Sequence, residues 1–147
     1  MKLTYEKIQE FIENYCKDYS LYANDADTMD KMDQYWLPDL TVTAYFHREN
    51  GDYPIVYSSR KEFQDFLVKS HQNIIDSMNP REIIIDVKKK KVVIQSIIEK
   101  TNRKTKEKIA IDGMGCYHLD TDENDNLKIK GFDFIWDAPA SIKNLGT

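Results

Sequence analysis

The chain has 147 residues, of which 41% are hydrophobic, 31% charged and 12% aromatic, and its formal net charge at pH 7 is −4. This composition excludes a disordered chain, and the length suits one domain, which we expect over residues 1–147. No apolar run approaches the ~18 residues of a membrane span. The charged N-terminal segment lacks the apolar core of a signal peptide, so the cytoplasm is the expected location. Cys16 and Cys116 lie far apart and predict neither a disulfide framework nor a metal site.

Two helical patterns begin the chain. Apolar residues recur at helical spacing over residues 4–22, which predicts a first helix there. Asn24 and Asp25 belong to the residue types that cap helix N-termini. They predict a second helix that carries Trp36 on its apolar face and ends before Pro38.

A capping box predicts the start of a third helix. Ser59 and Glu62 have the S-x-x-E spacing in which each side chain bonds a free N–H group of the first turn. The apolar face of this helix continues through His71 to Met78, and we expect Pro80 to end it.

Strand patterns dominate the rest of the chain. Residues 40–47 alternate between apolar and polar, and residues 53–57 are their expected hairpin partner. After residue 80, four strand-like stretches joined by short polar turns predict an antiparallel meander. Helices grouped before strands indicate an α+β fold, with three N-terminal helices packed on a curved, mostly antiparallel sheet. The lysine clusters at 88–91 and 100–108 fall in expected turns, and we interpret them as solvated hairpin tips rather than a nucleic-acid site.

The sequence leaves open which side chains of the last strand point toward the core. One alternating phase of residues 127–136 places Asp133 on the core face, where a buried carboxylate among aromatic rings is an acid–base candidate. The other phase, reached through a bulge at Gly131, turns the three rings of this strand inward and Asp133 outward. Rings facing outward would instead form an apolar patch suited to a homodimer through the sheet face.

The order of these elements resembles the nuclear-transport-factor-2-like superfamily, in its SnoaL-like branch of polyketide cyclases and scytalone dehydratase-type enzymes, with ketosteroid isomerases nearby. The resemblance covers the chain from about Tyr5 to Trp136. It rests on NDADTMDKMDQYWLPDLTV, on the capped helix SSRKEFQDFL and on the closing FDFIWD. It implies a cone-shaped α+β barrel in which a strongly curved sheet wraps a helix and leaves an apolar pocket, with no metal and no organic cofactor.

Four residues are candidates for acid–base catalysis. Asp25 stands where dehydratase-like members have an Asp that orients a histidine or binds substrate; the alternative is a helix cap. Tyr45 lies next to Ala44, which occupies the family's position for a carbonyl-polarising Tyr, and strict alternation sends Tyr45 outward unless a bulge precedes it. His71 is the available base where the family's histidine is missing, or else a core-edge histidine. Asp133 is the fourth candidate, in the alternating phase that places it on the core face.

The resemblance and the apolar stripes together predict both a pocket and a function. We expect a cofactor-free lyase or isomerase of dehydratase, cyclase or ketosteroid-isomerase type, acting on a small, apolar, oxygenated ligand. The alternative is a non-catalytic domain of the same fold that binds a hydrophobic ligand or associates through its sheet. We expect neither nucleic acid nor a membrane as a partner. The expected pocket residues are Tyr15, Tyr19, Trp36, Phe63, Phe66, Leu67, Tyr117, Phe134 and Trp136.

Overall fold

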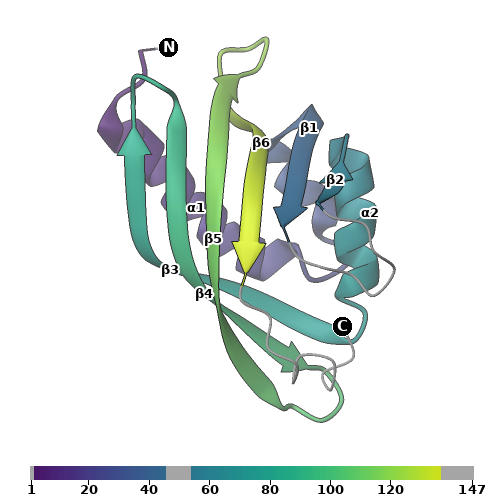
Figure 1. The fold of residues 1–147 in the computed structure, drawn as a ribbon. Helices are drawn as coiled ribbons and strands as arrows, with labels where there is room; N and C mark the ends of the chain where they lie inside the picture. The colour runs from purple at the N-terminus through teal and green to yellow at the C-terminus, as the bar shows by residue number, and fades with distance from the viewer. Residues whose placement is uncertain (1, 46–53, 137–147) are drawn as a thin grey trace.

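The chain folds as one six-stranded sheet with helices on one of its faces (Figure 1). The structure is a computed structural model, and it describes residues 2–45 and 54–136. The strand order is β2-β1-β6-β5-β4-β3, and every described neighbour pair is antiparallel except β1 and β6, which are parallel. The elements are α1 (Tyr5–Tyr22), the 3₁₀ helix η1 (Met29–Gln34), β1 (Trp36–Tyr45), β2 (Ile55–Tyr57), α2 (Arg60–Ser70), β3 (Ile74–Asp86), β4 (Lys91–Asn102), β5 (Lys108–Thr121) and β6 (Leu127–Trp136).

The first helix is confirmed as α1. The Thr4 hydroxyl accepts a hydrogen bond from the backbone N–H of Lys7 and caps the helix. A buried stripe at Ile8, Ile12 and Tyr15 packs against the sheet, because helical spacing puts these residues on one face. We call the helix-covered side of the sheet the inner face and the opposite side the outer face.

The second predicted helix is wrong in length and in cap. It is a six-residue 3₁₀ helix, η1, that begins after Thr28, and Trp36 is the first residue of β1 instead. The Asn24 side chain is unavailable as a cap because its amide bonds the backbone of Asp76 on β3, 52 residues away. Asp25 does not cap η1 either. The described part of the chain thus has two α-helices and one 3₁₀ helix, rather than three full helices.

The third helix is confirmed at its start and wrong at its end. The Ser59 hydroxyl accepts a hydrogen bond from the N–H of Glu62 at 3.1 Å, as a capping box requires. The helix ends at Ser70, however, and β3 begins at Ile74 and runs through Pro80. An edge strand tolerates proline, because one of its sides needs no ladder donors, and the β3–β4 register shifts just after Pro80.

The predicted hairpin and meander are confirmed, and β6 resolves the open choice of phase. Val42 pairs with Tyr57 in the first hairpin, and β3 to β6 pair in sequence; the predicted positions 46–53 lie outside the described residues. Between His118 and Leu119 the β5–β6 register shifts by one residue, at the expected bulge next to Gly131. Beyond the bulge Phe132 is buried and Asp133 faces outward. Tyr45 also faces outward, so no bulge turns it inward.

Aromatic rings fill the inner side of the sheet. Tyr15 of α1 contacts both Trp36 of β1 and Tyr117 of β5 edge to face, with ring centroids 6.2 and 5.7 Å apart. Phe63 of α2 packs against Trp36, and Phe132 stacks on Tyr117. These contacts join both helices to three strands in one core. No helix in the described ranges is long and apolar enough to cross a membrane.

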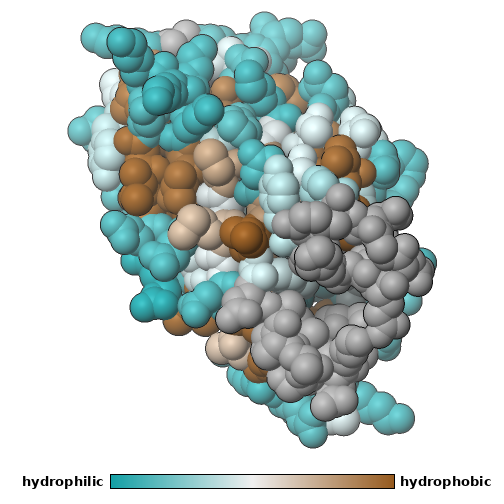
Figure 2. All heavy atoms as spheres, in the orientation of Figure 1, coloured by the Kyte–Doolittle hydropathy of each residue, from teal (hydrophilic) through white to brown (hydrophobic). Residues whose placement is uncertain are grey.

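The outer face carries exposed apolar side chains, and none of the helices in residues 2–45 and 54–136 lies over them. Figure 2 shows these brown groups on the side of the molecule that faces the viewer. Ile135 of β6 lies opposite Tyr45 of β1 on one side and Met114 of β5 on the other, so the three form a row across the sheet. Ile84 on β3 is a further exposed apolar residue.

Candidate functional site

A buried ion pair lies on the inner face of the sheet. Asp76 of β3 and Lys100 of β4 are direct cross-strand partners, and the Lys100 Nζ is 3.1 Å from the Asp76 Oδ1. Their side chains are only 9% and 5% exposed. Burying two charges costs free energy unless they pair with each other, so the fold depends on this contact.

His71 joins the ion pair from the end of α2. Its ring is buried, with Nδ1 at 2.6 Å from the carbonyl oxygen of Ala23 and Nε2 at 3.5 Å from the Asp76 Oδ2. The carbonyl oxygen can only accept a hydrogen bond, so Nδ1 carries a proton. Asp76, His71 and Lys100, together with Tyr19 of α1, form what we call the acid–base cluster.

The surroundings determine the charge state of Asp76 and of Tyr19. Burial raises the pKa of Asp76, but the hydrogen bond from His71 and the charge of Lys100 outweigh it, so that the pKa lies below its usual value. The pKa of Tyr19 is raised well above its usual value, first by burial and then by the charge of Asp76. At neutral pH the cluster therefore contains a carboxylate next to a neutral phenol.

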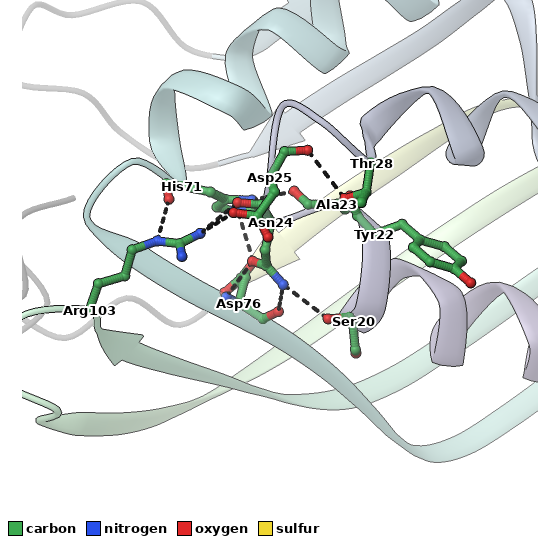
Figure 3. A network of polar contacts seen from close by, with 9 residues as sticks. All are labelled: Ser20, Tyr22, Ala23, Asn24, Asp25, Thr28, His71, Asp76 and Arg103. Carbon is green, nitrogen blue, oxygen red and sulfur yellow. Dashed lines mark hydrogen bonds and ion pairs between the residues drawn. The ribbon is translucent and has the colours of Figure 1, made fainter.

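Two further side chains hold the cluster in place (Figure 3). The Asn24 amide donates to the carbonyl oxygen of Asp76 and accepts from its N–H, at 2.9 and 2.7 Å. Arg103, in the β4–β5 turn, donates through Nε to the carbonyl oxygen of His71 and through Nη2 to that of Asn24. The loops that follow α1 and α2 are thereby fixed against the end of β4.

The four predicted catalytic residues lie in three places. His71 is inside the cluster. Asp25 is at its rim, where its carboxylate is 59% exposed and 3.3 Å from Arg103 Nη2. Tyr45 and Asp133 lie on the outer face, and the Asp133 Oδ2 is 3.4 Å from His118 Nε2. The structure thus brings Asp25 and His71 together through Arg103, and it does not bring Tyr45 or Asp133 to them.

The predicted pocket residues lie on the inner side, where most are packed against one another. The indole ring of Trp136 lies over Lys100 Nζ, 4.3 Å from its centroid, and so links these rings to the cluster. Six are buried and three are half-buried; the buried ones are Tyr15, Tyr19, Trp36, Phe63, Leu67 and Tyr117, and the half-buried ones are Phe66, Phe134 and Trp136.

Two polar atoms inside this aromatic core lack a normal hydrogen bond within the described residues. They are the Tyr15 hydroxyl and the Trp36 indole N–H, both fully buried. Burial raises the pKa of Tyr15 well above its usual range, and the neighbouring Trp36 and Tyr117 groups only partly offset the rise.

One surface hollow is seen elsewhere on the described part of the molecule. It has a volume of about 230 Å³ and lies between the first turns of α1 and the start of β6, lined by residues such as Lys7, Glu10 and Leu127. None of the cluster residues lines it. Residues 2–45 and 54–136 also contain no group of three His, Cys, Asp or Glu side chains placed to hold a metal.

Sequence reasoning missed Asp76 and Lys100. Asp76 fell inside the wrongly extended third helix, and Lys100 was assigned to a hairpin tip. One signal was available: Lys100 continues the alternating stripe of Ile94, Ser96 and Ile98, which are all buried on β4. A lysine in phase with a buried stripe needs a buried partner, and the partner strand supplies Asp76.

The chain is similar to known proteins in structure but not in sequence. No protein-family profile and no curated protein sequence matches the chain. Solved structures do match. A candidate isomerase from Bacillus subtilis has a TM-score of 0.70 at 12% identity, covering 97% of this chain and 94% of its own. A candidate SnoaL-like polyketide cyclase from Shewanella denitrificans has a TM-score of 0.59 at 17% identity, with 88% and 89% covered.

A third match is the epoxide hydrolase/cyclase-like enzyme SalBIII, which acts in pyran ring formation in the polyether salinomycin. Its TM-score is 0.63 at 14% identity, with 90% of this chain and 92% of the enzyme covered. Likeness at such identities establishes the fold. The resemblance to SnoaL-like proteins expected from the sequence is therefore confirmed at the level of the fold.

Proposed function

We propose that the protein is a cofactor-free lyase or isomerase that moves protons on a small oxygenated molecule at the acid–base cluster. The observation that carries this proposal is the contact of a carboxylate, an imidazole and an ammonium group, all buried on the inner face. In this proposal the curved sheet and the helices form a cone, and its aromatic side chains line the pocket. Matches to cyclase-type and ketosteroid isomerase-like structures support the reaction class.

The chemistry assigns one role each to Asp76, Lys100 and His71. The Asp76 carboxylate takes a proton from a carbon beside a carbonyl group, and the Lys100 ammonium stabilises the oxyanion that forms. His71 returns a proton, either to carbon in an isomerisation or to a leaving hydroxyl in a dehydration. Lys100 lowers the basicity of Asp76 in the free protein, and a substrate oxygen that attracts the ammonium group restores it. Asp25 contributes as a positioning residue through Arg103.

A proton-transfer probe tests this proposal. 5-Nitrobenzisoxazole opens to a coloured phenolate when a base removes its ring proton, and it needs no other recognition. We expect the protein to accelerate this reaction over buffer and Asp76→Asn to lower the rate about 100-fold, because a positioned general base contributes at least that much. Asp133→Asn, on the outer face, is the matched control and should keep the wild-type rate. A wild-type rate equal to buffer would contradict the proposal.

A second function is favoured by a different observation. The predicted pocket rings pack on one another, as in a structural core, and this suits a non-catalytic domain that binds a hydrophobic ligand or a partner. Such a domain would bind the neutral apolar dye Nile red equally well before and after Asp76→Asn, and would leave 5-nitrobenzisoxazole at its buffer rate. The two measurements together separate the two functions.

A further inference from the structure

The outer edge of β3 is occupied in its first half by side chains from α1 and from the loop after it. Among the described residues β4 is the only strand partner of β3, so β3 ends the sheet (Figure 1, left). The Asn24 amide bonds both the N–H and the carbonyl oxygen of Asp76. The Ser20 hydroxyl accepts a hydrogen bond from the N–H of Met78 at 3.0 Å. These contacts satisfy edge-facing backbone groups in this half, so a further strand cannot bond there.

The second half of β3 directs a different set of backbone groups to the edge. Pro80 carries no N–H, and the bulge after it leaves Arg81 without a pairing partner on β4. Before the bulge, even-numbered residues such as Asp76 point their N–H and C=O groups away from β4. One extra residue reverses this alternation, so Ile83 and Ile85 point theirs to the edge beyond the bulge. Each offers one donor and one acceptor to a further strand.

The side chains of this second half are accessible. Glu82, Ile84 and Asp86 are exposed, and Ile84 is 56% exposed. Long, exposed edge strands attract other strands, so natural proteins protect them with charge, proline, bulges or cover. On β3 the bulge and a turn rich in lysine lie at the two ends of residues 82–86. The stretch between them is accessible to a partner strand.

The charge around this stretch determines which kind of partner fits it. Residues 81–91 carry five basic and two acidic side chains, a net charge of +3, in a chain whose net charge is −4. Four of the five basic side chains are the exposed lysines at positions 88–91, in the turn to β4 and at the first residue of β4. Two copies of this stretch would repel each other if their edges paired, whereas an acidic segment would be attracted.

We infer that the second half of the β3 edge binds an extended, acidic segment of another protein, which extends the sheet by one strand. The backbone of this segment bonds Ile83 and Ile85, and its acidic end lies against the lysines at 88–91. In such strand additions the main-chain hydrogen bonds supply affinity and the side chains supply selectivity. The inference is independent of the proposed function, because it concerns the edge beyond Pro80 and not the acid–base cluster.

Three fluorescently labelled peptides test the inference by fluorescence anisotropy. The first alternates valine with threonine and carries glutamates at both ends. The second has the same sequence with N-methyl groups on every valine and threonine, and the third has lysines in place of the glutamates. We expect the first peptide to bind saturably and the other two to bind at least about tenfold more weakly, because one lacks backbone donors and the other is repelled by the lysine turn.

The peptide comparison uses the unmodified chain and can contradict the inference in three ways. Absence of saturable binding by the first peptide would overturn it. Equal binding of the N-methylated peptide would show that no strand is added. Equal binding of the lysine peptide would show that charge does not select the partner, and would overturn the acidic class.

Two charge variants locate the binding. Lys89→Glu reverses a charge in the turn beside the open edge, and Lys104→Glu makes the same change in the β4–β5 turn. Both lysines are exposed turn residues, so both variants are expected to fold. We expect Lys89→Glu to weaken the acidic peptide about fivefold and Lys104→Glu to leave the wild-type affinity. Equal effects of the two variants would overturn the proposed location.

A backbone variant tests the edge itself. Ile83→Pro removes one edge-facing N–H and should weaken the acidic peptide about tenfold, with the melting temperature reporting that the variant is folded. Ile135→Glu is the control for adhesion of the peptide to the apolar outer face, and it should keep the wild-type affinity. Wild-type binding by folded Ile83→Pro, or loss of binding in Ile135→Glu, would overturn the inference. If Ile83→Pro does not fold, the peptide series and the lysine variants decide.

Discussion

At the scale of single residues, Asp76 and Lys100 depend on each other. Each side chain is buried, and each meets its opposite charge directly across two neighbouring strands. Removal of one partner leaves a buried charge without compensation, which costs about 3–5 kcal/mol in comparable pairs, whereas removal of both is often neutral. The pair is thus expected to contribute to a specific arrangement more than to net stability.

A double-variant comparison measures this dependence. We expect Lys100→Met to lower the free energy of unfolding by about 3 kcal/mol, because Asp76 then remains buried with only His71 beside it. The double variant Asp76→Asn/Lys100→Met should recover a large part of that loss. Urea unfolding followed by circular dichroism gives both values. Additive losses in the double variant would show that the two groups act independently.

At the scale of elements, the end of the sheet depends on the bulge in β6. Before the bulge the Ile129 side chain is on the inner face, and after the bulge the Phe132 side chain is on the inner face. Gly131, at this point, lies against β1: a Cβ placed on it would be 2.8 Å from the backbone oxygen of Thr41. The parallel pairing of β1 with β6 therefore requires a residue without a side chain here.

A comparison of two glycine variants tests this requirement. Gly131→Ala should lower the free energy of unfolding by about 2 kcal/mol, because its methyl group meets backbone that cannot move aside. Gly113→Ala should cost less, since its methyl group meets Ile98 Cδ1 at 2.6 Å, the mobile end of a side chain. Thermal unfolding of both variants checks the order. The prediction fails if Gly113→Ala is the more damaging change.

At the scale of the whole molecule, the outer face has the composition of an association surface. We propose that two copies of the chain pair through this face, around the row of Tyr45, Ile135 and Met114. The neighbouring rows include polar side chains, Asp133 on one side of it and Asp112 on the other, which make a polar surround.

Light scattering after size exclusion checks the assembly. We expect the wild-type chain to have the mass of a dimer and Ile135→Glu to have that of a monomer, because a charge in an apolar interface is costly to bury. Leu21→Glu is the control: Leu21 is as exposed as Ile135, at 57% against 53%, but lies on α1. A monomeric wild-type chain, or dissociation caused by Leu21→Glu, would refute the proposed face.

Much of the fold could be predicted from the sequence, because periodicity and caps are local signals. The stripe of α1, the cap at Ser59 and the alternation of β4 to β6 each depend on residues a few positions apart. The start of β3 could not be predicted in this way, since a short apolar run fits a helix and a strand equally well.

The site was harder to predict than the fold for a related reason. His71 could be chosen from its residue type alone, but its partners come from two strands that only pairing brings together. Asn24 looked like a cap because capping is local, whereas its real partner is the backbone of Asp76. A long-range contact leaves no periodic signal in the sequence, so these assignments required the structure.

The parallel pairing of β1 with β6 also affects how the chain is made. Residues 36–45 emerge from the ribosome long before residues 129–135, yet among the described pairs Trp36 and Thr41 have their strand partners on β6 alone. The β1–β2 hairpin cannot pair with the rest of the sheet until synthesis is almost complete. Contacts of such long range form slowly. The nascent chain therefore exposes Trp36 and its neighbouring apolar residues during most of translation, a period in which chaperones are the natural protection against aggregation.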